Sequence, residues 1–207
     1  MLLGFAAGAV PVSNIAARWL RGTDLRQVGT GTVSGTGLAR VAGARAVMVA
    51  GVFELAKGAL GPFVAGEAPW PRALAGAAAV VGHNWSPWLG GAGGRGVAPS
   101  MGALLVSAPV GAALLAGGLV AGRLLGETAL GCLASYVCLV PVARRVHGPS
   151  GALAAGALLV PVLLKRLTGN EPARRPLVRA YAYRLLFDRD TLSRAPGARN
   201  GAGGGPS

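Results

Sequence analysis

Residues 29–37 read Gly-Thr-Gly-Thr-Val-Ser-Gly-Thr-Gly and are followed by an arginine, a pattern that suits the binding of an oxyanion. Glycines expose backbone N–H groups, the Thr and Ser hydroxyls add donors, and a guanidinium supplies charge in a bidentate geometry. The same composition is also typical of plain linkers, so the pattern alone leaves both interpretations open. The candidate residues of this segment are Gly29, Thr30, Gly31, Thr32, Thr36 and Arg40.

A second segment begins with Gly82-His83 and ends in Gly-Gly-Arg-Gly at positions 93–96. Such a run can turn backbone amides toward an anion while the arginine supplies the countercharge. His83 is either a proton-transfer group or a side chain at the membrane interface. The candidate residues of this segment are His83, Gly93, Gly94, Arg95 and Gly96.

Two further groups of polar residues stand out from an apolar background. Residues 165–171 follow an apolar stretch directly, so we interpret Lys165 as a positive anchor at the inner side of a membrane. Asn170 and Glu171 end this segment.

Glu54 and Lys57 lie three residues apart within another apolar stretch, where charges are costly. They are either a structural pair or part of a polar site.

The composition places these segments in a membrane protein. Of 207 residues, 52% are apolar and only 13% are charged, with a mean hydropathy of +0.52. A soluble domain of this size would need more polar residues to cover its surface. The net charge of +13 could indicate nucleic acid. We assign it instead to anionic lipid headgroups and anionic substrates, because the basic residues flank apolar stretches.

The apolar stretches predict an all-α, polytopic membrane bundle of about seven membrane segments, some of them short or broken. Loops with excess positive charge before residue 45 and after residue 164 should both face the cytoplasm. This requires an even number of crossings between them, so we expect the chain to break at Pro109. The apolar stretches cover approximately residues 1–20 (broken at Pro11), 43–65, 72–90, 97–121, 125–143 and 150–164.

The chain after residue 171 has a different composition. Residues 172–194 mix aromatic and aliphatic residues with Arg, which favours either a short helix at the headgroup level or a solvated tail. Residues 195–207 are Gly-rich and are expected to be disordered. We therefore divide the chain into a membrane domain, 1–171, and a basic cytoplasmic tail, 172–207.

The order of these motifs resembles that of the acyl-phosphate glycerol-3-phosphate acyltransferases of bacterial inner membranes (PlsY), over approximately residues 8–171. Residues 29–40 are similar to the family's first motif, Gly-Ser-Gly-Asn-x-Gly-x-Thr-Asn-x-x-Arg, and residues 54–58 to its Asp-x-x-Lys-Gly. The pairing of Gly82-His83 with residues 93–98 resembles its second motif, at the same spacing. Residues 166–171 resemble its third motif, Arg-Leu-x-x-Gly-x-Glu, one residue short.

The resemblance implies transfer of a fatty acyl group from acyl phosphate to the 1-hydroxyl of glycerol 3-phosphate, giving lysophosphatidic acid without a cofactor or metal. It implies no obligate protein partner, and a location in the bacterial inner membrane with the active loops in the cytoplasm. Thr30, Arg40 and Arg95 are the implied catalytic residues, and Asn170 with Glu171 would orient the glycerol hydroxyls. The other candidate residues named above would bind substrate.

The chain departs from the family pattern in each motif. In the first motif, Thr30, Thr32, Ser34 and Gly37 stand where the family has Ser, Asn, Gly and Asn. Arg95 replaces a lysine, which keeps the charge but changes the geometry. The His and Asn that precede the family's third motif are absent, because positions 161–164 are apolar. An alternative is therefore a degenerate, non-catalytic member that binds phospholipid or an anionic metabolite.

Overall fold

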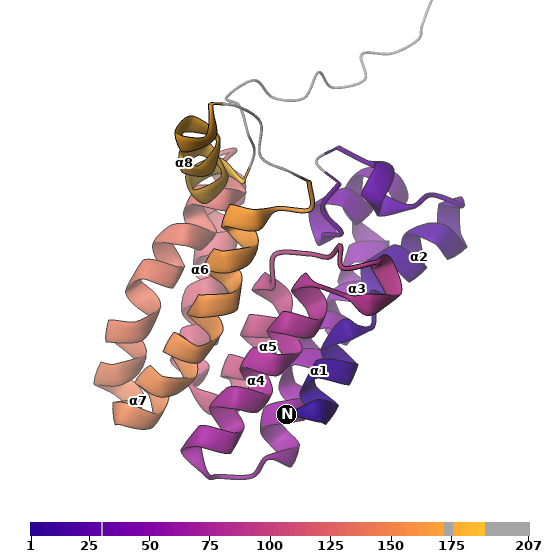
Figure 1. Ribbon diagram of the computed structural model, residues 1–207. Helices are drawn as coiled ribbons and strands as arrows, with labels where there is room; N and C mark the ends of the chain where they lie inside the picture. The colour runs from indigo at the N-terminus through magenta and orange to yellow at the C-terminus, as the bar shows by residue number, and fades with distance from the viewer. Residues whose placement is uncertain (30, 172–175, 189–207) are drawn as a thin grey trace, which may run out of the picture.

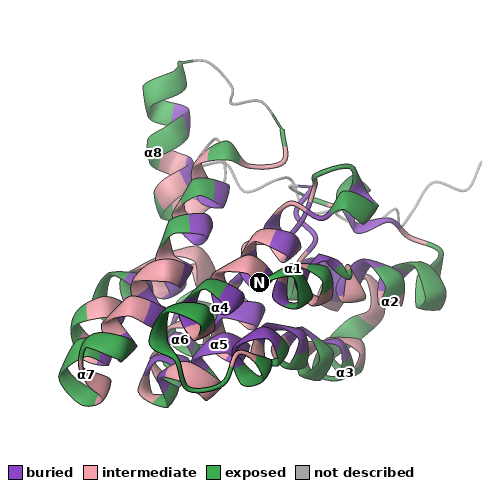
Figure 2. Ribbon diagram, turned by 60° about the horizontal axis from the view of Figure 1, so that its bottom comes forward, coloured by how far each residue is buried: buried purple, intermediate pink, exposed green. Residues whose placement is uncertain are grey.

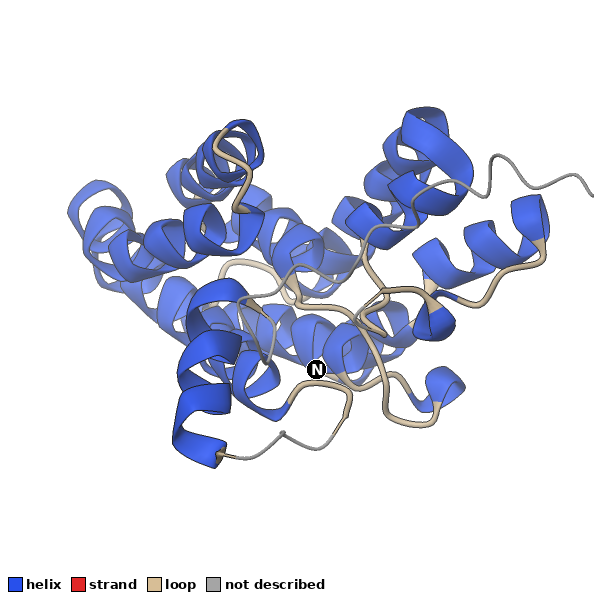
Figure 3. Ribbon diagram, turned by 90° about the horizontal axis from the view of Figure 1, so that it is seen from above, coloured by secondary structure: helices blue, strands red, loops and turns tan. Residues whose placement is uncertain are grey.

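A computed structural model describes residues 1–29, 31–171 and 176–188, and this part of the chain is helical without strands (Figures 1 and 3). The predicted all-α class is therefore confirmed. Two short 3₁₀ turns, η1 and η2, lie in the loops. In chain order the elements are α1 (Leu2–Ala9), α2 (Val12–Arg21), η1 (Leu25–Gln27), α3 (Gly35–Val64), α4 (Pro69–Asn84), η2 (Pro87–Leu89), α5 (Val97–Ser107), α6 (Pro109–Leu124), α7 (Thr128–Thr168) and α8 (Leu177–Phe187).

The helices break where the sequence predicts that they should. The first apolar stretch divides at Pro11 into α1 and α2, and the fourth divides at Pro109 into α5 and α6. Gly43 and Gly148 adopt non-helical backbone angles and bend α3 and α7. Helices α1, α3, α4, α5 and α6 and the two parts of α7 make up the seven expected segments of the described chain.

The third apolar stretch, expected to reach residue 90, ends as a helix six residues earlier, at Asn84. The Asn84 side chain is fully buried and donates a hydrogen bond to the Pro161 carbonyl, 3.0 Å away. Ser86 is also buried, and its hydroxyl donates to the Ala9 carbonyl at 2.6 Å. These bonds turn the chain into η2, and the residues of the second motif consequently lie in a loop.

Small residues let the helices approach closely, as is common where packing drives helix association in lipid. A Cβ on Gly8 of α1 would overlap the backbone of Ala79 in α4. A Cβ on Gly58 of α3 would likewise overlap the backbone of Pro99 in α5. Larger residues at these crossings would separate the helices that support the loops.

The distribution of polar residues fits a bilayer environment. The outer face of α3 exposes Val49, Val52 and Phe53, and Figure 2 shows further exposed residues on the outer helices. The interior, in contrast, contains charged side chains such as Glu54 and Lys57. Of the described helices, α3 and α7 are long and apolar enough to cross a membrane, judged by length and composition.

The basic tail forms a helix over part of its length. Helix α8 lies at the end of α7, at the upper end of the molecule in Figure 1. Its Arg184 is buried and donates hydrogen bonds to the carbonyls of Leu167, Thr168 and Glu171. Of the two alternatives for residues 172–194, the structure has a helix over Leu177–Phe187. Residues 195–207, expected to be disordered, lie outside the described residues.

Candidate active site

Three segments far apart in sequence meet at one end of the bundle, where the loops cross between the helices (Figure 3). The Val33 amide donates to the Gly93 carbonyl at 3.2 Å. The Asn170 side chain donates to the carbonyls of Gly31 (2.9 Å) and Gly93 (3.0 Å), and it accepts from the Gly93 amide (3.2 Å). We call Gly31, Val33, Gly93 and Asn170 the loop junction.

Asn170 therefore has a different role from the expected one of orienting substrate hydroxyls. Both N–H donors of its amide bind backbone carbonyls, and its oxygen binds a backbone amide. A side chain whose donors are fully used cannot also donate to a substrate. Asn170 instead joins the first and second motifs to the end of α7.

Gly93 and Gly94 are required for packing, which corrects the expectation that their amides face an anion. The Gly93 amide donates to Asn170 and the Gly94 amide donates to the His83 carbonyl. A Cβ on Gly93 would overlap the backbone carbonyls of His83 and Asn84, and one on Gly94 would overlap the His83 ring. The loop is thus pressed against the end of α4.

Gly96 is also explained by backbone geometry. It precedes α5 with φ of +74°, a left-handed conformation that glycine adopts readily. A Cβ there would lie 2.7 Å from Val80 Cγ1. Of the residues at 93–96, Arg95 is consequently the one with a side chain that can bind an anion.

The first motif ends at the N-terminus of α3. Ser34 caps this helix, because its hydroxyl accepts a hydrogen bond from the Gly37 amide at 3.2 Å. Thr36 is exposed in the first helical turn, and Thr32 is buried in the preceding loop. Thr30 lies outside the described residues.

Arg40 extends back from the second turn of α3 toward the preceding loop. Its Nη1 lies 3.1 Å from the position that a Cβ would take at Gly29, and the residue is exposed. A helix N-terminus beside a guanidinium is a favourable place for an anion. The exposed residue Glu171 also approaches this loop, with its Oε1 3.8 Å from the position that a Cβ would take at Gly31.

An ion pair fixes the chain before this loop. Asp24 accepts hydrogen bonds from the backbone and side chain of Arg26, with 2.7 Å between Oδ2 and Nη2. The side-chain hydrogen bond from Arg26 holds the pKa of Asp24 at about 2. Arg26 also donates to the Leu89 carbonyl at 3.3 Å, so the first and second motifs are joined here as well.

Arg95 has two partners from the C-terminal part of the chain. Its Nη1 donates to the Lys165 carbonyl at 2.9 Å, and its Nε lies 2.6 Å from Oδ1 of Asp188. Asp188 follows α8 with φ of +57°, an uncommon value for a residue other than glycine. The Asp188 carboxylate is therefore paired with the guanidinium that, from the sequence, we expect to bind an anionic substrate.

Lys165 is buried, which contradicts its interpretation as an anchor at the membrane surface. Only 1% of the residue is exposed, and its Nζ lies 5.1 Å from the centroid of the Trp85 ring. The helical period could have shown this, because Pro161 and Leu158, also buried, lie four and seven residues earlier on the same face. Arg40, Arg95 and Lys165 come one from each of the three segments that the loop junction joins, and we call them the cation group.

Glu54 and Lys57 form part of a second, fully buried polar region. Glu54 accepts from the Ser13 hydroxyl at 3.2 Å, and its Oε2 lies 2.8 Å from Lys57 Nζ and 3.2 Å from His83 Nδ1. Lys57 also donates to the Val10 carbonyl at 2.8 Å. We call Ser13, Glu54, Lys57 and His83 the buried cluster.

His83 connects the buried cluster to the second motif. Only 10% of its side chain is exposed, which argues against the second of its two interpretations, a side chain at the membrane interface. Its Nδ1 faces Glu54, while its Nε2 lies against Gly94. The imidazole thus holds the loop in register with α4.

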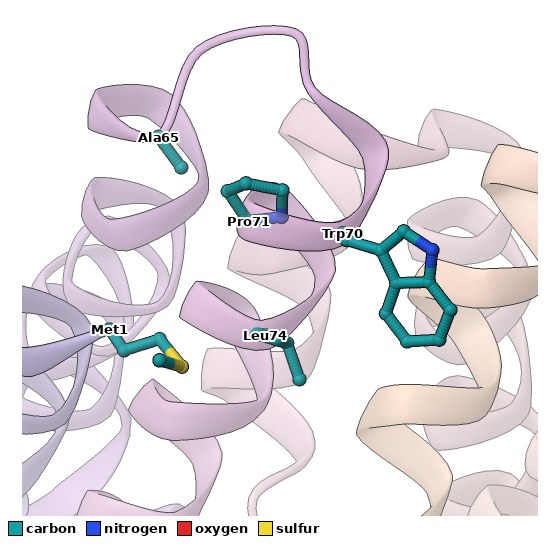
Figure 4. Close-up of a pocket in the computed structure, with 5 residues that line it drawn as sticks. All are labelled: Met1, Ala65, Trp70, Pro71 and Leu74. Carbon is teal, nitrogen blue, oxygen red and sulfur yellow. The ribbon is translucent and has the colours of Figure 1, made fainter.

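Two apolar hollows lie away from the loop junction. One, of about 360 Å³, lies beside the turn between α3 and α4 and is lined by Met1, Ala65, Trp70, Pro71 and Leu74 (Figure 4). The other, of about 330 Å³, lies between the first two helices and α3. Its lining residues are Ala7, Val10, Val12, Phe53, Ala56, Lys57 and Leu60.

The family model for glycerol-3-phosphate acyltransferase matches residues 1–170. The chain belongs to this family. A glycerol-3-phosphate acyltransferase 5 of Dehalococcoides mccartyi is 30% identical over 94% of this chain and 89% of its own length. A glycerol-3-phosphate acyltransferase of Myxococcus xanthus is 38% identical over 77% of this chain and 76% of its own length.

Solved structures of an acyltransferase in this family have the same fold. The glycerol 3-phosphate form of PlsY (YgiH), an integral membrane protein, has a TM-score of 0.70 at 20% identity, covering 80% of this chain and 85% of that one. The lysophosphatidic acid form has a TM-score of 0.68 at 18% identity, covering 86% and 94%. The fold of this chain is thus that of an integral membrane acyltransferase.

Proposed function

We propose that this chain transfers a fatty acyl group from acyl phosphate to the 1-hydroxyl of glycerol 3-phosphate and releases lysophosphatidic acid and phosphate. Family membership supports the acceptor and the product. The observation that carries the site assignment is the loop junction, which joins the segments that bear Arg40, Arg95 and Lys165. Both substrates carry a phosphate group, and a group of cations suits two neighbouring anions.

The reaction needs little from the protein beyond positioning and charge stabilisation. The acceptor hydroxyl attacks the acyl carbonyl, the new C–O ester bond forms, and the bond between the carbonyl carbon and the phosphate oxygen breaks. A phosphate oxygen takes the hydroxyl proton in our proposal. Because phosphate is already a good leaving group, no covalent intermediate on the enzyme is required, and Arg40 and Arg95 would stabilise the developing negative charge.

The apolar hollow of about 330 Å³ between the first two helices and α3 is where we place the acyl chain. Its wall is apolar except for Lys57, which belongs to the buried cluster. The cluster in turn reaches the second motif through His83 and Gly94. An acyl chain in this hollow would therefore have its carboxyl end near Lys57. From there the buried cluster extends to the loop of the second motif.

We also propose that the loop junction faces the cytoplasm. The segment that carries the first motif has the excess of basic residues that favours the cytoplasmic side, with Arg18 and Arg21 at the end of α2 and Arg40 near the start of α3. Labelling of a cysteine placed at the exposed Gln27 by an impermeant reagent in intact cells tests this. Labelling only after lysis supports a cytoplasmic junction, whereas labelling in intact cells contradicts it.

The test of function is an assay of purified protein with acyl phosphate and glycerol 3-phosphate, with lysophosphatidic acid and released phosphate as products. We expect equal amounts of the two products from the wild type, and little of either from Arg40→Ala or Arg95→Ala. Arg145→Ala, which removes an exposed arginine from the middle of α7, is the matched control and should retain activity. Binding of glycerol 3-phosphate without product formation would support the non-catalytic alternative instead.

A further inference from the structure

Lys165 is a buried cation in the last turn of α7. The residue is 1% exposed, and the ammonium group lies over the Trp85 ring at 5.1 Å. An aromatic face attracts a cation only weakly compared with a carboxylate. Burying an ammonium group without a counter-ion is costly, so its retention needs an explanation.

The comparison with Lys57 shows what is unusual about Lys165. Lys57 is buried to a similar extent, and its Nζ lies 2.8 Å from a Glu54 carboxylate oxygen and 2.8 Å from the Val10 carbonyl oxygen. Among the described residues we find the ion pairs Arg26–Asp24, Lys57–Glu54 and Arg95–Asp188, and a contact of the His83 imidazole with Glu54. None of them includes Lys165.

A second cation lies beside Lys165. The Arg95 guanidinium donates to the backbone carbonyl of Lys165 at 2.9 Å, so this second positive group lies against the last turn of α7. The Asp188 carboxylate lies 2.6 Å from Arg95 Nε and forms an ion pair with it. Two cations with one carboxylate leave a net charge of +1. A phosphate monoester that takes the place of the Asp188 carboxylate would bring two negative charges to balance the two cations.

We propose that Lys165 binds the phosphate group of a substrate together with Arg95. This rests on the proposed function, because it takes the ligand to be phosphorylated, and it adds a residue that the family's motifs do not include. Asn170 supports the assignment, since it ties the chain five residues after Lys165 to Gly93, two residues before Arg95. The side chain of Lys165 thus lies where the second and third motifs are held together.

The test replaces Lys165 by methionine, which has a similar length and packs well on an aromatic ring. We expect the dissociation constant of inorganic phosphate, measured by calorimetry, to rise at least tenfold. The KM of glycerol 3-phosphate or of acyl phosphate should rise by a similar factor, and the substrate affected identifies the phosphate that Lys165 binds. The unfolding midpoint in detergent should not fall, because an unpaired buried charge is removed.

Arg145→Met is the matched control, because it removes an exposed positive charge from the middle of α7 and should leave both constants unchanged. Unchanged phosphate binding and unchanged KM values in Lys165→Met would overturn the proposal and show a packing role against Trp85. If the methionine variant does not fold, Lys165→Gln also removes the positive charge, and the same phosphate dissociation constant and KM values are measured for it.

The phosphate measurement separates this proposal from the proposed function. A wild type that binds phosphate through Lys165 but makes no lysophosphatidic acid would support the role of Lys165 and contradict acyl transfer. An active wild type with an equally active Lys165→Met variant would support acyl transfer and contradict the role of Lys165.

Discussion

The cation group and the buried cluster both hold charged side chains in a mostly apolar protein, but they balance charge differently. In the buried cluster, Glu54 Oε2 has the Lys57 ammonium at 2.8 Å and the His83 imidazole at 3.2 Å. In the cation group, Arg95 has a single carboxylate partner, and Lys165 has none among the described residues. Arg40 is exposed.

The difference indicates which region binds substrate. Charges that are matched within the protein stabilise one arrangement of helices, and removing one partner leaves a buried charge uncompensated. Charges that are not matched create a positive potential that an anionic ligand can use. The buried cluster therefore holds the loops in place, and the cation group is where phosphate should bind.

The largest effect is expected when the matched region is broken. Glu54→Gln leaves Lys57 buried without its carboxylate and should lower the free energy of unfolding by about 3–5 kcal/mol. Thermal or denaturant unfolding in detergent measures this loss. The activity of the molecules that remain folded should change much less.

The double variant Glu54→Gln, Lys57→Met sharpens this test, because it removes both charges. It should recover a large part of the lost stability. A double variant less stable than Glu54→Gln alone would show that the two side chains do not act as a matched pair.

Arg95→Ala should affect catalysis rather than folding. Loss of one donor to developing charge typically costs about 10²–10³-fold in rate, and we expect a loss of this size in kcat/KM. Arg95→Lys keeps the charge and matches the lysine of the family motif, so it should recover most of the activity. Equal losses in the two variants would mean that the charge of Arg95 is not what matters.

Asn170→Ala should have a smaller effect, which acts through the loop junction. The change leaves the carbonyls of Gly31 and Gly93 and the Gly93 amide without this partner. Each lost hydrogen bond costs about 1 kcal/mol of stability. The misplaced loops should in addition lower kcat/KM by about tenfold, because catalysis depends on the positions of the groups that they carry. A variant that instead loses only discrimination among alcohol acceptors would restore the substrate-orienting role expected from the sequence.

Asp188→Asn should have the smallest effect and the opposite sign. Its carboxylate occupies Arg95 at 2.6 Å and must give way if a phosphate is to bind there. Removing this charge should lower the KM of one phosphorylated substrate by about threefold, the scale of a partly exposed ion pair. A raised KM would mean that Asp188 positions Arg95 for substrate.

The sequence predicted the path of the chain better than the roles of its polar residues. Pro11 and Pro109 interrupt apolar stretches, and each interruption is a break between two helices in the structure. Local backbone chemistry determines these features, so they can be read without knowledge of the packing. The end of α4 was missed because it depends on a long-range bond from Asn84 to Pro161.

The structure brings the three candidate segments together, but the contacts of single residues could not be predicted from the sequence. Nothing local to Gly94 reveals that its amide binds the His83 carbonyl, or that its missing side chain makes room for the His83 ring. Lys165 was misread because a basic residue after an apolar stretch is usually exposed. Its burial depends on Trp85, a residue of another helix end.

The most direct test of the account is the affinity for glycerol 3-phosphate, measured by calorimetry in detergent for two sets of variants. Arg40→Ala and Arg95→Ala should each weaken binding at least tenfold while retaining the wild-type unfolding midpoint. The double variant Glu54→Gln, Lys57→Met should weaken binding less than threefold in molecules that are folded. Wild-type affinity in both arginine variants, with binding lost in the double variant, would contradict the assignment of phosphate to the cation group.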